Sequence, residues 1–353
     1  MADALVAPAC SNQSVPLPNA GLPAIHVEQL RKVYLSNTTG PGLSGAVRGL
    51  LRPVRSERVA VDGISFSVAP GERVGFIGVN GAGKSTTIKM LTGILTPTSG
   101  TVQVLGRDPH RQRVANAREI GAVFGQRTQL WWDLPLRDSL RLIGRMYEVP
   151  ADRLQALTKE FTRTLDLGEL LPKAVRTMSL GQKMRAELAA TLIHEPRVVY
   201  LDEPTIGLDL VAKEAIRAFI LAQNRERGTT VFLTTHDMGD IEELAERIIV
   251  IDQGRMLFDG PLRTLKARYG AGRLLTLDTV GLVGETQLHL PPGAAEEARD
   301  GHRLTVRLDP DVVGAGAVAA AVMTQLEVRD FTLQEPDLTR VIGRIYAGEQ
   351  GRA

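Results

Sequence analysis

The sequence is poor in cysteine, in net charge and in long apolar runs. Cys10 is the one cysteine among 353 residues, which excludes an internal disulfide framework and favours a reducing compartment such as the cytoplasm. Forty-two Lys and Arg against 40 Asp and Glu leave a charge of +2, so no global basic field indicates a nucleic-acid partner. The longest run without charged or strongly polar residues, 312–323, is far shorter than the ~20 apolar residues of a membrane helix. The chain is not expected to cross a bilayer by itself.

The length and the local patterns predict two domains after a flexible tail. At roughly 150 residues per domain, 353 residues correspond to about two domains. Residues 1–24 contain four prolines and one charged residue without periodicity, so we expect a flexible tail there. The first domain is predicted over 25–262. The second, a small α+β domain over 268–348, combines an alternating strand at 304–308 with helical apolar spacing at 338–346.

The first domain has the pattern of an α/β fold with an additional antiparallel sheet. Residues 25–34 and 64–68 alternate between apolar and polar side chains, as strands of a small antiparallel subdomain do. The apolar runs 198–201 and 231–233 are typical of buried parallel strands in a core sheet. Residues of about 110–195 are mostly helical in pattern and are predicted to form a helical subdomain.

A phosphate-binding loop is predicted between a strand and a helix. Gly78-Val-Asn-Gly-Ala-Gly83-Lys84-Ser85 matches G-x-x-x-x-G-K-[ST] in that context. Its backbone N–H groups and the following helix N-terminus would cradle the phosphates of ATP, Lys84 would reach the β and γ phosphates, and Ser85 would bind Mg²⁺. The predicted nucleotide-binding residues of this loop are Gly78, Asn80, Gly81, Gly83, Lys84, Ser85 and Thr86.

Two carboxylates follow the apolar strand at 198–201. Asp202 suits Mg²⁺, directly or through a water ligand, and Glu203 is placed to polarise an attacking water. An Asp-Glu pair after a strand is often a helix cap or a solvated turn. Downstream of a phosphate-binding loop, the Mg²⁺ and water interpretation is much stronger.

Three further motifs resemble those of one family. Met178-Ser179-Leu180-Gly181-Gln182 resembles the LSGGQ signature of ABC ATPases, Gly207-Leu208-Asp209 resembles their D-loop, and Thr234-Thr-His236 resembles the segment with their switch histidine. Ser179 precedes Asp202 by 23 residues, and His236 follows it by 34, in the family's order. The chain is therefore identified as resembling an ABC transporter ATP-binding subunit over about residues 25–260, a P-loop NTPase of ABC type with a small C-terminal α+β domain.

The resemblance implies roles for further residues. Gln126 matches the Q-loop glutamine, which touches Mg²⁺ or the attacking water, with Gln129 as the alternative choice; Tyr34 matches the aromatic that stacks on adenine. Ser85, Gln126 and Asp202 would form the Mg²⁺ site, and Glu203, His236 and Gln126 the catalytic group. A second ATPase subunit, identical or related, would be bound head-to-tail. The residues expected to complete its ATP site in trans are Ser179, Gly181, Gln182 and Asp209.

An insertion over about 37–57 follows Tyr34. Leu43, Val47, Leu50 and Leu51 fall on one helical face, and three arginines add positive charge. This pattern suggests a helix that contacts the membrane surface or a permease; a surface helix packed on its own domain fits equally well.

The sequence around Trp131-Trp132 resembles the corresponding segment of ATPases that pair with ABC-2-type exporter permeases, most closely those of the viologen-exporter type. The tryptophans follow Gln126 in the region that receives the coupling helix of the membrane subunit, where one of them is expected to be exposed and the other buried. The predicted function is ATP hydrolysis that powers export through separate permease subunits, at the cytoplasmic face of the membrane as a peripheral protein. The alternatives are an ABC ATPase that acts on nucleic acid or ribosomes, and a catalytically dead subunit. Non-transport ABC ATPases usually carry long coiled-coil insertions or two ATPase domains in one chain, and neither feature is expected from this sequence. A dead subunit conflicts with the intact motif residues Lys84, Asp202, Glu203 and His236.

Overall fold

The computed structural model describes residues 21–38, 54–125, 128–269, 272–281, 288–309, 312–334, 338–346 and 348. The predicted flexible tail falls almost entirely outside these ranges. The predicted insertion helix and Gln126 also lie outside the described residues.

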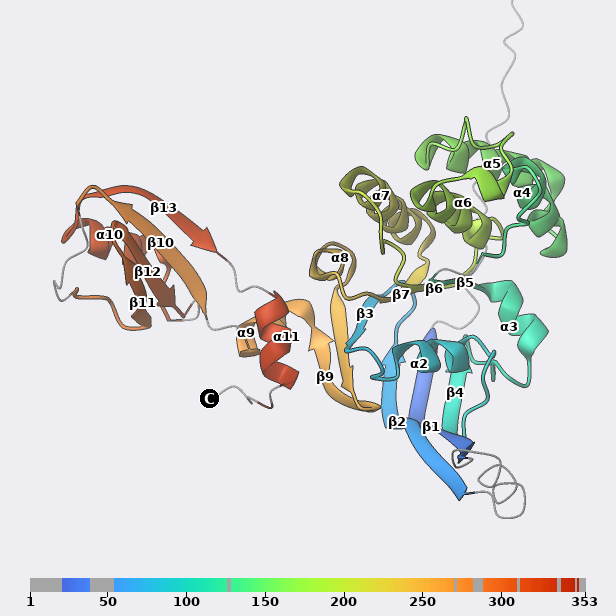
Figure 1. Cartoon of the computed structure of the whole chain (residues 1–353), viewed down its shortest axis with the longest axis horizontal. Coiled ribbons are helices and arrows are strands. Elements are labelled where there is room, and N and C mark those ends of the chain that lie inside the picture. Colours follow the sequence, from blue (N-terminus) through green and yellow to red (C-terminus); the bar gives the residue numbers. More distant parts are fainter. Residues whose placement is uncertain are drawn as a thin grey trace, which may run out of the picture.

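A six-stranded mixed sheet forms the centre of the molecule (Figure 1). Its strand order is β5-β6-β7-β3-β8-β9; neighbours pair in parallel except at the β8-β9 edge. The predicted parallel strands are confirmed, and they are apolar because helices and a second sheet cover both faces. The strands are β3 (Arg73–Gly78), β5 (Ile120–Phe124), β6 (Val198–Asp202), β7 (Thr230–Thr234), β8 (Arg247–Asp252) and β9 (Arg255–Pro261).

The strand order brings the predicted chemistry together. β6, β7 and β3 are direct neighbours and run in parallel, so their carboxyl ends lie at one edge of the sheet. Asp202 ends β6, His236 follows β7, and the phosphate-binding loop follows β3. Ligands of open parallel sheets bind at this edge, and residues far apart in the sequence therefore meet there.

The predicted antiparallel subdomain is a three-stranded sheet of order β2-β1-β4. It shares a buried cluster with the central sheet, in which Phe66 stacks on Phe232 at a ring-centroid distance of 5.9 Å. Helix α2, which follows the phosphate-binding loop, contributes Ile88 and Leu91 to the same cluster. The elements are β1 (Ile25–Thr38), β2 (Val54–Val68), β4 (Ser99–Val104) and α2 (Lys84–Leu91).

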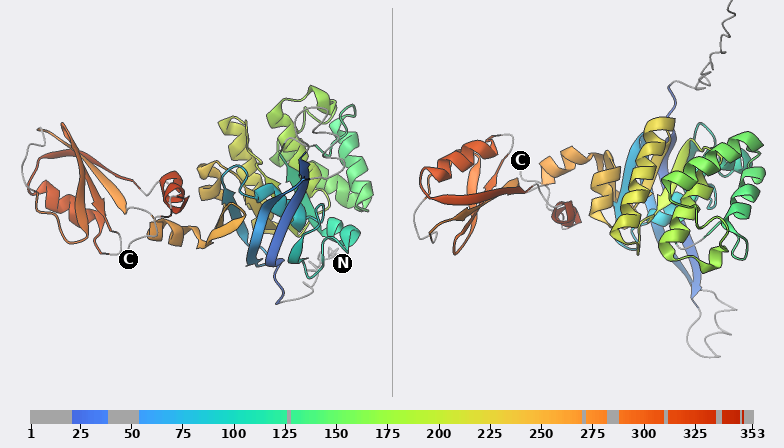
Figure 2. Two further views of the ribbon diagram at one scale, coloured as in Figure 1. Left: turned by 60° about the horizontal axis from the view of Figure 1, so that its bottom comes forward. Right: turned by 90° about the horizontal axis from the view of Figure 1, so that it is seen from above.

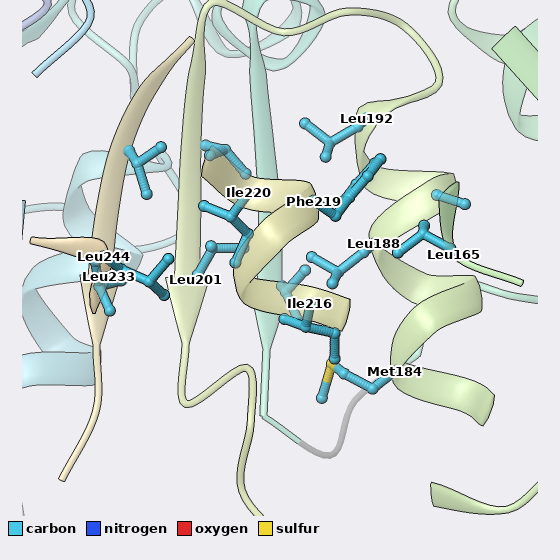
Figure 3. Packing of buried hydrophobic residues seen from close by; sticks show 14 of the residues in the cluster. Leu165, Met184, Leu188, Leu192, Leu201, Ile216, Phe219, Ile220, Leu233 and Leu244 are labelled. Atoms are coloured by element: carbon cyan, nitrogen blue, oxygen red, sulfur yellow. The ribbon is translucent and has the colours of Figure 1, made fainter. Parts of the chain in front are cut away.

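Helices cover the other face of the central sheet. Figure 3 shows α7 between the strands and α6, with Ile216, Phe219 and Ile220 directed into the cluster that contains Leu188 and Leu201. The helical elements between β4 and β8 are α3 (Arg113–Glu119), α4 (Leu136–Met146), α5 (Ala151–Thr164), the 3₁₀ turn η1 (Val175–Thr177), α6 (Leu180–Leu192), α7 (Leu210–Arg227) and α8 (Met238–Leu244), of which α3 contributes no residue to this cluster. None of the helices in the described ranges is long and apolar enough to span a membrane.

A third sheet, of four strands, lies to one side of this core and is joined to it by α9 and α11 (Figures 1 and 2). Its order is β11-β12-β10-β13 with antiparallel neighbours, and α10 packs on one face through Val318 and Val322. The predicted helix at 338–346 is confirmed as α11. The elements are α9 (Leu262–Tyr269), β10 (Arg273–Thr279), β11 (Ala294–Asp300), β12 (Arg303–Leu308), α10 (Ala315–Met323), β13 (Val328–Gln334) and α11 (Leu338–Tyr346).

Candidate nucleotide-binding and hydrolysis site

The phosphate-binding loop borders a cavity of about 570 Å³. Lys84 is buried at the start of α2, and its ammonium donates to the Gly78 carbonyl at 2.6 Å. Burial lowers the pKa of Lys84, while the negative charges of Glu203 and Asp202 act in the opposite direction. An anion bound in the cavity would add a further negative charge beside the ammonium. The predicted nucleotide-binding residues that line the cavity are Tyr34, Asn80, Gly81, Gly83, Lys84, Ser85 and Thr86.

Gly83 shows why this loop requires glycine. It precedes α2 with φ 110°, a conformation that L side chains rarely adopt. A Cβ atom there would lie far inside van der Waals distance of the Ala60 carbonyl oxygen. The loop thus packs directly against the backbone of β2, which fixes the position of the helix N-terminus beside the cavity.

Oxygen donors for a divalent cation converge at the ends of α2, β6 and β7. The Ser85 hydroxyl donates to Asp202 Oδ2 at 3.0 Å, and the Thr234 hydroxyl donates to Asp202 Oδ1. A hydroxyl and a carboxylate are the hard oxygen ligands that suit Mg²⁺, so these residues fit the ion. Thr234 has no predicted role, although a buried threonine at the end of a parallel strand that pairs with Asp202 indicates one.

Glu203 and His236 face each other beside these oxygens. His236 Nδ1 lies 3.2 Å from Glu203 Oε1, and the Glu203 backbone N–H donates to the Thr234 carbonyl at 2.9 Å. Glu203 has φ 56°, in the left-handed region that disfavours L side chains by about 1–2 kcal/mol. Strained backbone of this kind is concentrated at functional sites, where it holds a side chain in a particular direction.

The opposite wall of the cavity comes from the antiparallel sheet. Tyr34 is partly exposed there, and its cross-strand partner Arg58 lines the same cavity. Lys32 places its ammonium 5.5 Å from the centre of the Tyr34 ring. Arg58 is not predictable from the sequence motifs, because its place opposite Tyr34 depends on the strand register.

The signature residues form a helix N-terminus elsewhere. Ser179 caps α6: its hydroxyl accepts from the Gln182 N–H, and the Gln182 side chain accepts from the Ser179 N–H. Asp209 caps α7 by accepting from the Ala212 N–H at 2.8 Å. Neither Ser179, Gly181, Gln182 nor Asp209 is among the described residues that line the nucleotide cavity of the same chain.

The segment that follows Gln126 is held by α6. The buried carboxylate of Glu187 accepts from the Thr128 hydroxyl at 2.7 Å and from the Gln129 N–H at 2.9 Å. Burial raises the pKa of Glu187, and these hydrogen bonds partly offset that effect. Glu187 belongs to none of the predicted motifs. Its one sequence clue is a carboxylate within the apolar face of α6.

Both tryptophans of the chain are exposed. The exposed fraction is 39% for Trp131 and 52% for Trp132, so the expectation that one of the two indoles is buried is wrong. The Lys183 ammonium lies 4.4 Å from the Trp132 ring, which gives this indole a partner on α6 without covering it.

These features together define a P-loop ATPase, and comparison with known proteins identifies its family. A model described as ABC transporter matches residues 61–206. Daunorubicin resistance ATP-binding protein DrrA3 of Streptomyces coeruleorubidus is 34% identical over 291 residues, which cover 81% of this chain and 90% of that protein. Nod factor export ATP-binding protein I of Paraburkholderia xenovorans (strain LB400) is 40% identical over 209 residues, or 58% of this chain and 66% of that protein.

A solved structure shares the fold. The dimeric post-hydrolysis state of the ATP-binding cassette MJ0796, bound to ADP and Pi, aligns with 68% of this chain and 99% of that chain. Its TM-score is 0.57, at 23% sequence identity. The chain belongs to the ABC transporter ATP-binding proteins, and it is an ATP-hydrolysing member of that family.

Proposed function

We propose that this chain is the ATPase of an ABC-2-type export system and powers export through separate permease subunits. The ATPase part of the proposal rests on the group of contacts at the carboxyl ends of β3, β6 and β7, where Ser85 meets Asp202 and Glu203 meets His236. The names of the relatives, which concern daunorubicin resistance and Nod factor export, support an exporter. The sequence around Trp131-Trp132 favours the viologen-exporter type among ABC-2-type export systems.

The proposed binding step uses the loop after β3. The N–H groups of the loop and the start of α2 hold the β and γ phosphates, and the Lys84 ammonium neutralises them. Tyr34 packs on the adenine, and Arg58 adds positive charge at the same wall. Ser85 and Asp202, with Gln126, would hold Mg²⁺, whose charge when bound stabilises the phosphate oxygens.

The proposed hydrolytic step uses Glu203 and His236. Glu203 accepts a hydrogen bond from the attacking water and so orients it toward the γ phosphate. His236 lies 3.2 Å from that carboxylate, and its exposed side chain can contact a γ-phosphate oxygen. Both act on a substrate already fixed by the loop, so positioning and charge stabilisation supply the catalysis.

Two ATPase chains would form the complete site. Ser179, Gly181 and Gln182 lie at the N-terminus of α6, an end of a helix that attracts anions, and they are not among the described residues of the chain's own cavity. In a head-to-tail dimer they would face the γ phosphate bound by the other copy, with Asp209 beside it. The second copy is either this chain or a related one.

The permease would bind at the exposed indoles next to Gln126. Trp131 and Trp132 offer large amphipathic surfaces, the kind of side chain that dominates protein contacts. The chain would thereby reside at the cytoplasmic face of the membrane as a peripheral protein, with the insertion at 37–57 as a further membrane-side or permease contact.

The test is capture of the tagged chain from detergent-solubilised membranes, followed by mass spectrometry and by ATPase assay of the reconstituted complex. We expect an integral-membrane protein in fixed stoichiometry, altered ATPase activity when it is present, and loss of both in a Trp131→Ala, Trp132→Ala variant. Val312→Ala, at an exposed position of the small domain, is the matched control. Recovery of ribosomal proteins or nucleic acid with the ATPase unaffected by any membrane protein would favour the non-transport alternative.

A further inference from the structure

The last helix, α11, packs on the ATPase core instead of on the small sheet. Its residues Leu338, Val341, Ile342 and Ile345 are buried in the same cluster as Leu265 of α9. The small sheet and α10 form a separate cluster. Helices α9 and α11 contact each other and both pack on the core. The strands β10 to β13, which lie between these two helices in the sequence, therefore form an inserted domain (Figures 1 and 2).

Helix α11 also forms one wall of a cavity whose other walls are the hydrolytic loops. This cavity of about 440 Å³ has Ile342 and Tyr346 on one side. Asn80, Glu203 and His236 line it from the loops after β3, β6 and β7. The C-terminal helix therefore faces the groups that would orient water and contact the γ phosphate.

Tyr346 contacts the start of the phosphate-binding loop. Its hydroxyl is buried without a hydrogen-bond partner among the described residues, although the Val79 N–H lies close to it. Burial, together with the charge of Asp252, raises the pKa of Tyr346 to about 12, so the phenol is neutral at physiological pH. Since the phenol carries no charge and its hydroxyl has no hydrogen-bond partner among the described residues, we expect Tyr346 to act on the loop through the packing of its ring.

The cavity beside α11 overlaps the nucleotide cavity only in part. The nucleotide cavity is lined by Tyr34 and the phosphate-binding loop, and neither Ile342 nor Tyr346 is among its described lining residues. The second cavity shares Asn80 and Glu203 with it and adds His236. A change in α11 would therefore reach the hydrolytic groups before it reached the adenine or the bulk of the phosphate cradle.

We propose that Tyr346 and Ile342 are positioning residues for ATP hydrolysis. Their side chains pack against the start of the phosphate-binding loop and the loop that carries His236, and they hold both loops in place relative to Glu203. The proposal rests on the roles proposed above for Glu203 and His236. Because α11 is the element that follows β13 in the sequence, it also links the small sheet to the hydrolytic groups.

The test measures kcat and KM for ATP in the full chain. Tyr346→Ala is expected to lower kcat by about 10- to 100-fold, the effect of displacing catalytic groups by about 1 Å, with KM little changed. Tyr346→Phe keeps the ring and removes only the unpartnered hydroxyl, so it should retain wild-type kcat. Ile342→Val, which removes one methylene group, should lower kcat by a smaller factor and serves if Tyr346→Ala does not fold.

Val341→Ala is the matched control, because Val341 is buried on the same helix but is not among the described lining residues of this cavity. It should reduce thermal stability without lowering kcat. The proposal is overturned if Tyr346→Ala keeps or raises kcat, if it raises KM alone, or if Val341→Ala loses as much kcat. Glu203→Gln measured in parallel separates the two proposals: an inactive Glu203→Gln beside a fully active Tyr346→Ala overturns only the role of α11.

Discussion

His236 Nδ1 lies 3.2 Å from Glu203 Oε1, although the two residues are separated by 33 positions in the sequence. The contact exists because β6 and β7 are parallel neighbours, so the residues after the two strands leave the sheet at the same edge. Glu203 is also held in a strained backbone conformation with φ 56°. Geometry of this kind fits a carboxylate whose direction matters for chemistry.

Glu203→Gln is therefore expected to lower ATP hydrolysis by about 10²- to 10⁴-fold, the usual contribution of a general base, while ATP binding is retained. The measurement is steady-state ATPase activity together with equilibrium binding of a fluorescent ATP analogue. Glu226→Gln, at an exposed position of α7, is the control and should behave like the wild type. Wild-type turnover in Glu203→Gln would contradict the assignment.

Complementation in trans tests the proposed head-to-tail dimer. Lys84→Ala disables a chain's own phosphate-binding loop, and Ser179→Arg disables the signature that it offers to its partner. Each variant alone should be inactive. A mixed dimer has one site with an intact loop and an intact signature, so the mixture should recover part of the wild-type activity, up to about half per dimer if the two sites act independently. A mixture that remains inactive although mixed dimers form would contradict completion of the site in trans.

Gly83→Ala is expected to abolish nucleotide binding and to destabilise the fold. The added methyl group would collide with the Ala60 carbonyl oxygen in a backbone conformation with φ 110°. Gly228 at the end of α7 is the matched control: it has φ 65° but no atom within 4 Å of an added Cβ. Gly228→Ala should cost about 1–2 kcal/mol of stability from strain alone and keep ATP binding. Equal losses in the two variants, measured by urea unfolding, would contradict the clash.

The phosphate-binding loop, Asp202, Glu203 and His236 could be predicted from the sequence because each follows a short apolar strand within a local motif. The small sheet was predicted only as a fold class, and its order depends on pairings such as that of β10 with β13. The apolar spacing of α11 predicted a helix, but it could not indicate which of two cores that helix would join. An apolar stripe specifies that a face is buried and leaves its partner open.

Other residues of the site were missed for a similar reason. Arg58 reaches the cavity only through its register with Tyr34, and that register includes several irregularities between β1 and β2. The exposure of both tryptophans follows from the loop conformation at 131–132, where alternation of a regular strand does not apply. Long-range pairing and loop geometry are therefore the parts that local pattern leaves undetermined.

Glu187→Ala is expected to destabilise the segment after Gln126. The substitution removes the acceptor of the Gln129 N–H and of the Thr128 hydroxyl. Because both residues are exposed and water can replace the carboxylate, the expected loss is about 0.5–1.5 kcal/mol for each hydrogen bond. Glu187→Gln keeps one acceptor oxygen and removes the cost of burying a charge, so its loss should be smaller. Urea unfolding of both variants gives the comparison. Equal stability of the Ala variant and the wild type would contradict this role.

His194 is expected to make stability depend on pH below neutrality. The ring stacks on Tyr147 at 3.9 Å, and its Nε2 lies 2.9 Å from the Ile120 carbonyl oxygen. Burial lowers the pKa of His194 below its ordinary value of 6.5, and the contact with Ile120 offsets this in part. Between that lowered pKa and 6.5 the unfolded chain binds more protons than the folded one, so the stabilising contribution is complete above about pH 6.5 and is lost as the pH falls.

His194→Gln can still donate to the Ile120 carbonyl but does not titrate. Relative to this variant, the wild type should therefore lose free energy of unfolding as the pH is lowered from 7.5 to about 5. Urea unfolding at several pH values measures the difference, and the same substitution at the exposed His110 controls for a general effect of removing a histidine. If the difference between wild type and His194→Gln stays constant over this range, burial of a neutral imidazole does not contribute to acid sensitivity. Any loss of stability at low pH must then come from carboxylates that pair with arginines. Glu195 is an example, because its hydrogen bond with Arg153 lowers the pKa of Glu195.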